Sequence, residues 1–488
     1  MNNPVRKIAV SVMVMILLLF ANLTYVQVVK ADDYRTDSRN QRTAYAEYSR
    51  QRGQITADGK VLAQSVATDD RLRYQRQYPG GPAFASVTGY LSLSFGRTGI
   101  EGAADSVLNG TDDRLFVRRL SDLITGRDPR GGNVSLTILP TVQQVAYDQL
   151  TQKGYAGSVV ALQPQTGEIL AMVSTPAFDP NLLASHNDKT VQDAWNADNA
   201  AQPQVLLNRA ISVPQPPGST FKVVDTAAAL QNGSTPDTLL TAQGDRFLLD
   251  DGVTTMDNYN KTQCGTGTTT TLRDAFARSC NTAFADLVRS VGVDGLRKQA
   301  EAFGIGQSGL AVPMKVTPST IGNITSVTAL QQSAIGQKDV KLTPLQNAMV
   351  VSAVANGGQL MAPYLIKEIQ GPELDTVDTT EPDRIGQAVP AGVAATLTDL
   401  MIGSENRTQG GGKIAGIQIA SKTGTAELNS KADFPLTWYV AFAPAEKPTV
   451  AIAVLVEDGG DLGLEATGGS IAAPIGRAVI AEALKAGR

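Results

Sequence analysis

The chain has 488 residues, of which 42% are hydrophobic and 18% charged, and its formal net charge at neutral pH is −4. This length can bury more than one hydrophobic core, so we expect two or three domains, and the negative charge argues against a nucleic-acid partner. A single histidine, His186, and two cysteines argue against a Ser-His-Asp hydrolase and a zinc site. We interpret His186, which lies in a polar loop, as a solvated residue, and we expect neither a metal nor a cofactor.

The N-terminus carries an apolar run over residues 8–29, preceded by Arg6 and Lys7. The run is long enough to span a bilayer. Because positive residues stay on the cytoplasmic side, we expect a single-pass protein of the cell membrane whose bulk, from Lys30 onward, is extracytoplasmic. A cleaved signal peptide is the alternative, since Val29-Lys30-Ala31 loosely fits a cleavage pattern.

Residues 31–133 form a polar segment that is rich in Arg, Asp and Gly. The pattern predicts a helix over 33–49 and short strands over 54–56 and 84–87. The turn-rich stretch 127–132 predicts a domain boundary. We therefore divide the chain into an anchor (1–30), an N-terminal segment without a catalytic motif (31–133) and a larger domain (134–488).

The larger domain alternates between helical and strand patterns. A helix is predicted over 142–150, a hairpin over 158–162 and 168–174, strands over 416–420, 438–443 and 449–457, and a closing helix over 471–484. A strand pair, a helical middle, a strand triplet and a final helix together indicate the α+β class.

The first candidate functional motif is Ser219-Thr220-Phe221-Lys222. Residues three apart share one face of a helix, so the Lys222 amine could take the proton of the Ser219 hydroxyl if the amine is neutral. Burial and a neighbouring cation, for which Lys422 is the candidate, both favour a neutral amine. We expect a helix from near Ser219 to residues 232–233, whose first N–H groups would stabilise an oxyanion. Alone, such a pair also fits an ordinary helix surface.

Two further motifs follow in order. Ser279-Cys280-Asn281 could supply a proton relay, or could simply cap the next helix. Lys422-Thr423-Gly424-Thr425 could supply a cationic anchor, or could be the end of the strand predicted over 416–420. Together the three motifs provide a nucleophile, its base, a relay and an anchor, which is a complete acyl-transfer site without histidine.

With these motifs the chain resembles the penicillin-binding proteins and serine β-lactamases. Near the N-terminus, Arg50-Gln51-Arg52-Gly53-Gln54-Ile55 and Gly59-Lys60-Val61-Leu62-Ala63 resemble the pedestal of class B penicillin-binding proteins. The modest length is most similar to that of the actinobacterial members. The resemblance implies an antiparallel sheet flanked by helices, an all-helical lobe, the site between them, an N-terminal pedestal and one transmembrane helix.

The resemblance also implies an activity, that of a serine D,D-transpeptidase that cross-links peptidoglycan and is acylated by β-lactams. Ser219 would attack the penultimate D-Ala carbonyl of a stem peptide ending in D-Ala-D-Ala. Lys222 would accept its proton, Ser279 would pass a proton to the departing D-Ala, and Asn281 would bind the substrate backbone.

In the third motif, Lys422 with the hydroxyls of Thr423 and Thr425 would hold the terminal carboxylate, with Gly424 between them. The backbone N–H groups of Ser219 and Thr425 would form the oxyanion hole. Cell-wall synthesis or division proteins are expected partners. The alternatives are a D,D-carboxypeptidase or β-lactamase, and a non-catalytic β-lactam sensor or division scaffold.

The two cysteines, Cys264 and Cys280, would lie outside the membrane, where disulfides persist. Their even number and this compartment predict a bridge that restrains the second motif. The alternative is two buried free thiols.

Overall fold

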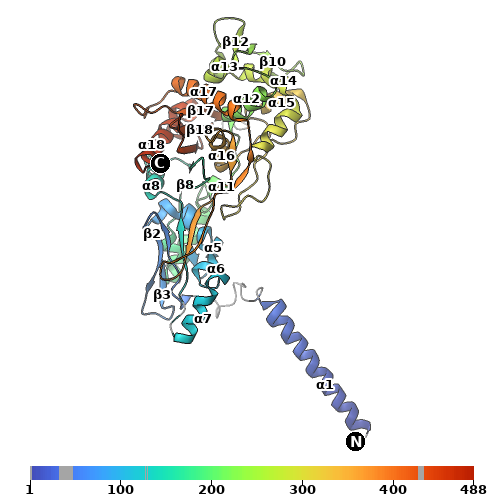
Figure 1. Ribbon diagram of the computed structural model, residues 1–488, viewed down its shortest axis with the longest axis vertical. Helices are drawn as coiled ribbons and strands as arrows, with labels where there is room; N and C mark the ends of the chain where they lie inside the picture. Colours follow the sequence, from blue (N-terminus) through green and yellow to red (C-terminus); the bar gives the residue numbers. More distant parts are fainter. Residues whose placement is uncertain are drawn as a thin grey trace.

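The computed structural model describes residues 3–31, 34, 45, 48–126, 128, 130–426 and 434–487. Figure 1 shows a long N-terminal helix, a narrow pedestal and a broad upper domain that contains the C-terminus. The helix predicted over 33–49 lies mostly outside the described residues.

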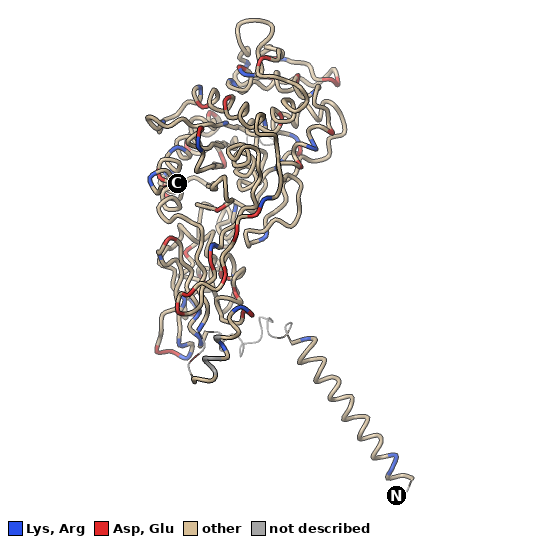
Figure 2. Tube along the Cα trace, viewed as in Figure 1, with Lys and Arg blue, Asp and Glu red and all other residues tan. Residues whose placement is uncertain are grey.

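The N-terminal helix consists of α1 (Asn3–Thr24) and the π-helical turn η1 (Tyr25–Val29). These 27 residues form the one helix of the described chain that is long and apolar enough to cross a membrane. At 1.5 Å per residue they extend about 40 Å, more than the hydrocarbon core requires. None of the side chains of α1 is buried, and Figure 2 shows charges only near the two ends of this helix. The helix fits the expected membrane anchor.

The pedestal is built on a six-stranded sheet with the order β15-β14-β6-β1-β2-β3. Its strands are β1 (Ile55–Ala57), β2 (Lys60–Ala67), β3 (Tyr74–Gln77), β6 (Asn133–Leu136), β14 (Ile366–Gln370) and β15 (Thr376–Thr379). Strand β6 pairs in parallel with β1 and antiparallel with β14. The expected boundary at 133/134 therefore falls inside β6, and two strands of the pedestal sheet come from the C-terminal half of the chain.

The strand predicted over 84–87 is wrong, because these residues are helical. They lie in the 3₁₀ turn η2 (Gly81–Phe84) and the short helix α4 (Ala85–Thr88). Pro82 stands in the first turn, where its fixed φ suits a helix, and the apolar residues Phe84 and Val87 point into one core. Short strands β4 (Leu91–Ser92) and β5 (Gly96–Arg97) and four helical segments complete the pedestal: α5 (Gly99–Ala103), α6 (Asp105–Leu108), η3 (Asp113–Leu115) and α7 (Phe116–Thr125).

A buried ionic cluster holds the pedestal together. Arg52 Nε donates to Glu101 Oε2 at 2.7 Å, Arg76 Nε donates to Glu101 Oε1 at 2.6 Å, and the Tyr78 hydroxyl donates to the same oxygen at 3.2 Å. Burial alone would raise the pKa of Glu101, but the two guanidinium groups outweigh burial and lower this pKa. The carboxylate is therefore ionised and fully compensated.

The upper domain contains a five-stranded antiparallel sheet with the order β17-β18-β19-β7-β8. Its strands are β7 (Gly157–Leu162), β8 (Ile169–Thr175), β17 (Ala420–Ala426), β18 (Leu436–Ala443) and β19 (Val450–Val456). The predicted hairpin and the two late strands are confirmed. The strand predicted over 416–420 is displaced, since β17 begins at Ala420 and contains the third motif in its interior. Because β17 is an edge strand, one side of it remains open to the site.

Helices cover both faces of this sheet. α8 (Pro140–Thr151) and α18 (Ala473–Lys485) pack on one face, and α16 (Pro344–Ala355) packs on the other (Figure 1). A lobe beside β17 contains α12 (Lys222–Gln231), α13 (Leu272–Arg278), α14 (Asn281–Ala302), α15 (Val327–Ser333) and α17 (Ala391–Arg407). This lobe is not all-helical, because β9 (Leu239–Thr241) pairs with β12 (Thr269–Thr271) and β10 (Phe247–Leu248) pairs with β11 (Thr255–Met256).

The interpretation of His186 as a solvated loop residue is wrong. Its side chain is 15% exposed, and Nδ1 lies 2.5 Å from Asp70 Oδ2 of the pedestal. This contact lowers the pKa of Asp70. His186 therefore joins the upper domain to the pedestal.

Candidate active site

Ser219 lies in a 3₁₀ turn, η4 (Gly218–Phe221), that leads directly into α12. The helix predicted to begin near Ser219 therefore begins at Lys222, and it ends at Asn232 as expected. Two contacts fix the approach to this turn: Trp438 Nε1 of β18 donates to Pro216 O at 2.9 Å, and Asn347 Nδ2 of α16 donates to Thr220 Oγ1 at 2.9 Å. The half-buried Ser219 is thus held on a rigid corner.

The backbone crowds this corner from two sides. A Cβ atom at Gly218 would lie 2.6 Å from Thr425 O, and one at Gly424 would lie 2.6 Å from Pro217 O. On the opposite side, a Cβ at Gly336 would lie 2.1 Å from Gly218 O. Glycine at these three positions lets the turn lie directly against β17 and the loop at Gly336.

Lys222 is fully buried, and its amine points to the second motif. Nζ donates to Ser279 O and to Asn281 Oδ1, both at 2.8 Å, and lies 3.4 Å from Ser279 Oγ. In the described residues no hydrogen bond joins Lys222 to Ser219. Burial and the nearby Lys422 lower the pKa of Lys222 well below that of a free lysine. A neutral amine has two N–H groups, which these two oxygens can take up, and one lone pair, which remains for a proton.

The second motif stands between two helices, at the end of α13 and the start of α14. Ser279 adopts the left-handed conformation, with φ of 61° and ψ of 40°, which is strained for a serine. The N-cap of α14 is Cys280, whose side chain makes no capping hydrogen bond, and Asn258 Oδ1 accepts from Thr282 N in the first turn at 3.1 Å. The capping alternative for Ser279 is therefore wrong. Cys280 forms a disulfide with Cys264, as predicted, so the strained residue is flanked by a covalent link.

Lys422 approaches Ser279 from the opposite side. Its Nζ donates to Ser279 Oγ at 2.8 Å and to Thr423 O at 3.0 Å, and its side chain is buried. Burial lowers the pKa of Lys422 to about 7. Ser279 Oγ therefore lies between two amines, one from α12 and one from β17, as a proton relay requires.

The remaining residues of the third motif lie along the same strand. Thr423 and Thr425 are half-buried. Each lies an odd number of residues from Lys422 along β17, so both side chains point to the face of the strand opposite the Lys422 side chain. Thr425 Oγ1 accepts a hydrogen bond from Gly468 N at 3.3 Å. The structure thus brings the three motifs together at the edge of the sheet.

Sequence reasoning missed a buried network behind this strand. Glu405 of α17 accepts hydrogen bonds from Ser421 and from the Tyr439 hydroxyl at 3.0 Å, and it pairs with Arg477 Nε at 2.8 Å. Ser421 precedes Lys422 in β17, so this network fixes the strand that carries the third motif. Only the apolar surroundings of Arg477 in the sequence could have suggested that it is buried with an acidic partner.

Asp225 was also missed, although it lies one helical turn after Lys222. Both of its carboxyl oxygens are buried without a hydrogen-bond partner in the described chain. Burial raises the pKa of Asp225 well above its usual range, and Lys222 offsets this only in part. Burial therefore favours the protonated form of Asp225, whereas a charged Asp225 would raise the pKa of Lys222.

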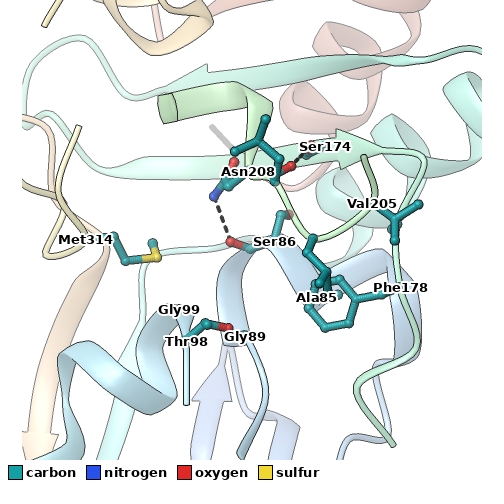
Figure 3. Close-up of a pocket in the computed structure, with 13 residues that line it drawn as sticks. Ala85, Ser86, Gly89, Thr98, Gly99, Ser174, Phe178, Val205, Asn208 and Met314 are labelled. Carbon is teal, nitrogen blue, oxygen red and sulfur yellow. Dashed lines mark hydrogen bonds between the residues drawn. The ribbon is translucent and has the colours of Figure 1, made fainter. Parts of the chain in front are cut away.

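A separate small cavity, of about 70 Å³, lies between the pedestal and the upper domain (Figure 3). Asn208 Nδ2 donates to Ser86 O at 2.8 Å, and the backbone N–H of Arg209 donates to Ser174 Oγ at 3.1 Å. The bond from Asn208 to Ser86 therefore joins the upper domain to the pedestal. None of the three motifs lines this cavity.

Comparisons with known proteins agree with this architecture. The penicillin-binding protein transpeptidase domain matches residues 157–481, and the penicillin-binding protein A dimerisation domain matches residues 52–134. The peptidoglycan D,D-transpeptidase PbpA of Mycolicibacterium smegmatis is 55% identical over 100% of both chains. The protein of the same name from Mycobacterium tuberculosis is 52% identical over 99% of both chains.

Solved structures give the same result. The ceftriaxone acyl-enzyme complex of penicillin-binding protein A from M. tuberculosis superposes with a TM-score of 0.89 and 51% identity, covering 90% of this chain and 100% of that chain. The corresponding penicillin G complex has a TM-score of 0.86. The chain belongs to the class B penicillin-binding proteins. The expected likeness to the actinobacterial members, penicillin-binding protein A, is confirmed.

Proposed function

We propose that this chain is a membrane-anchored D,D-transpeptidase that cross-links peptidoglycan stem peptides through an acyl-enzyme on Ser219. The observation that carries the proposal is the position of Ser279 Oγ, which lies between Lys222 and Lys422 beside the corner that presents Ser219. Burying two amines that have no hydrogen-bonded carboxylate lowers the stability of the fold. The lowered pKa values that result suit these amines for acid-base catalysis.

In the acylation step, Ser219 Oγ forms a bond to the penultimate D-Ala carbonyl carbon, and Lys222 accepts the hydroxyl proton. The oxyanion is stabilised by the backbone N–H groups of Ser219 and Thr425. The C–N bond to the terminal D-Ala then breaks, and Ser279 passes its proton to the departing nitrogen. Ser279 regains a proton from Lys222, so the released D-Ala leaves as the neutral amine and the serine ester remains.

The substrate is held on both sides of the cleft between lobe and sheet. Asn281, whose Nδ2 donates to Asp257 O at 3.1 Å, is positioned to hydrogen-bond the peptide backbone. The hydroxyls of Thr423 and Thr425 would hydrogen-bond the terminal carboxylate of the substrate beside Gly424, and the positive charge of Lys422 would attract this carboxylate.

In the second step, an amine of another stem peptide attacks the ester, which forms an amide and returns the proton to Ser219. The competing reaction is hydrolysis, in a D,D-carboxypeptidase or a β-lactamase. In the described chain no carboxylate hydrogen-bonds to Lys222, Ser279, Asn281 or Lys422, and burial favours the protonated form of the nearby Asp225, so no carboxylate contacts these four residues to activate water. These features favour transfer to an amine over hydrolysis.

The test of the nucleophile is covalent labelling with a fluorescent penicillin. The β-lactam ring presents the same carbonyl, and its opening should leave a stable adduct that mass spectrometry places on the peptide containing Ser219. Ser219→Ala should abolish the label, whereas labelling that survives this substitution contradicts the assignment. Adding an amine acceptor to a D-Ala-D-Ala substrate then separates a transpeptidase, which forms the cross-linked product, from a hydrolase.

The proposal also covers the placement of the chain. Residues 1–30 would form the anchor, 31–133 most of the pedestal and 134–488 the transpeptidase domain together with the pedestal strands β14 and β15. The transpeptidase domain would lie outside the cell membrane, where wall-synthesis or division proteins could bind it. The positive charges of Arg6 and Lys7 before the apolar run support this orientation. A thiol-reactive, membrane-impermeant reagent should label a cysteine introduced at the exposed Val253 in intact cells, and protection of that cysteine would contradict the orientation.

A further inference from the structure

Helix α7 (Phe116–Thr125) at the end of the pedestal exposes an apolar face. Phe116 is 55% exposed, Val117 77%, Leu120 46% and Ile124 76%. Their spacing of one, four and eight residues puts these four side chains on one side of the helix. The described side chains on the other side, Arg119 and Thr125, are polar.

Nothing in the described chain covers this face. Among the described side chains of α7 only Arg119, which donates to Thr111 O at 2.7 Å, is less than about one-third exposed, and the element that α7 contacts most is the short turn η3. A helix of 10 residues is marginal in water unless an apolar face packs against something. The apolar face of α7 is therefore open to a partner beyond the described residues.

The position of α7 identifies that partner. Figure 1 shows α7 at the end of the pedestal where the chain arrives from α1. The anchor helix ends at Val29 and the pedestal begins near Tyr48, so the connecting chain can span at most roughly 65 Å. The base of the pedestal therefore stays within reach of the bilayer that α1 crosses.

Arginine side chains near α7 are suited to contact with the anionic surface of a bilayer. A concavity of about 530 Å³ lies where the chain enters the pedestal, and it is lined by Arg50, Arg73 and Arg130 together with Asp128. Asp128 and Arg130 follow the C-terminal end of α7 in the chain, and Figure 2 shows basic residues, with acidic residues beside them, at this end of the pedestal. Arg73 pairs with Asp128 at 3.0 Å and Arg130 pairs with Glu373, yet all three guanidinium groups border the opening.

We propose that α7 is a second membrane contact, which lies in the interface of the bilayer with its apolar face among the acyl chains and the arginines toward anionic headgroups. A second copy of this chain is a poorer partner, because a symmetric contact through α7 would bring like-charged arginine clusters together. Together with the anchor helix α1, this contact holds the pedestal at the membrane at two points. The proposal does not depend on the proposed acyl-transfer chemistry.

The test uses the full chain in lipid nanodiscs that hold a single copy each, made from phosphatidylcholine and phosphatidylglycerol. Cys264 and Cys280 are bridged, so Ile124→Cys provides the one reactive thiol of the described chain for a polarity-sensitive fluorophore. Lipids brominated along the acyl chain should quench the probe at 124 several-fold more than a probe at Val253→Cys. Val253 is 83% exposed in the lobe far from α7. Equal quenching at the two sites would overturn the proposal.

Two further measurements distinguish a membrane contact from a contact between two copies of the chain. Val117→Asp combined with Leu120→Asp should remove the quenching at 124, while penicillin labelling shows that the protein remains folded. Persistent quenching in this variant would contradict a role for the apolar face, and quenching as strong in pure phosphatidylcholine would contradict the role of the arginines. If the probe at 124 is shielded only in nanodiscs with two copies, α7 is an interface between copies and the proposal fails.

Discussion

The pedestal and the active site each bury two cationic side chains, but they differ in what surrounds these cations. In the pedestal, Arg52 and Arg76 share the carboxylate of Glu101. In the active site, Lys222 and Lys422 meet only neutral oxygens and each other. A compensated cluster keeps its charge at every working pH and serves as structure, whereas the two amines have lowered pKa values and can exchange protons.

The difference predicts opposite outcomes for substitutions. Removing a cation from the active site should affect chemistry more than stability. Removing the anion from the pedestal should affect stability more than chemistry, because the buried Arg76 would lose its counter-ion and Arg52 would keep only Asp105.

The largest effect is expected for Lys222→Ala. Loss of a general base should lower the rate of acylation by penicillin by on the order of 10²–10⁴-fold, with a smaller change in initial binding. Stopped-flow acylation kinetics measure this effect, and Lys298→Ala, an exposed lysine of α14, is the control. An acylation rate equal to that of the control would show that another group is the base.

The next effect is expected for Glu101→Gln. Breaking this buried ion cluster should lower the free energy of unfolding by about 3–5 kcal/mol, with an unchanged rate of acylation per folded molecule. Denaturant titration measures the loss. The matched control is Glu373→Gln, whose exposed pair with Arg130 should contribute about 1 kcal/mol or less. If Glu101→Gln instead lost acylation and kept normal stability, the pedestal cluster would serve the chemistry rather than the fold, contrary to this prediction.

A third test concerns the disulfide. In the chain-entropy model, a loop closed by Cys264 and Cys280, 16 apart in sequence, contributes about 3 kcal/mol. Cys264→Ala should therefore lower stability by this order and slow acylation, because Cys280 lies between Ser279 and Asn281. Thiol counting on denatured, unreduced wild-type protein should find no free thiol, and two free thiols would contradict the bridge.

The smallest effect, taken per pH unit, is a dependence of stability on pH. The pKa of Lys422 falls from 10.5 to about 7 on folding, so between these values the unfolded chain binds more protons than the folded one. Stability should therefore increase as pH rises through this window, by at most about 1.4 kcal/mol per pH unit, and the full penalty of a buried charge should act below pH 7. Melting temperatures of wild type and Lys422→Met across this range test the sign, because the variant should have a shallower upward slope, to which only Lys222 still contributes.

Much of the active site could be predicted from the sequence, because its parts are short motifs whose chemistry depends on residue type. The pairing of Lys222 with Lys422 and the disulfide followed from the same logic. The absence of a hydrogen bond between Ser219 and Lys222, and the strain at Ser279, depend on backbone geometry that no motif encodes.

The pedestal was harder to predict for a physical reason. Glu101 finds Arg52 and Arg76 across 49 and 25 residues, and His186 finds Asp70 across 116. Partners at such separations leave no local pattern. At residues 84–87, alternation of large and small side chains suggested a strand, yet the helical start at Pro82 and burial on one side decided the outcome. The participation of β14 and β15 in the pedestal sheet is likewise a long-range pairing.

The glycines around the Ser219 turn limit which substitutions in this protein could make a bacterium resistant to β-lactams. Any side chain at Gly218, Gly336 or Gly424 would collide with backbone, which cannot move aside as a side chain can. Selection therefore has few ways to narrow the drug's entrance at these positions. The half-buried Thr423 and Thr425 remain open to substitution, but under the proposed mechanism they also bind the peptide, so resistance gained there would slow the bacterium's own wall synthesis.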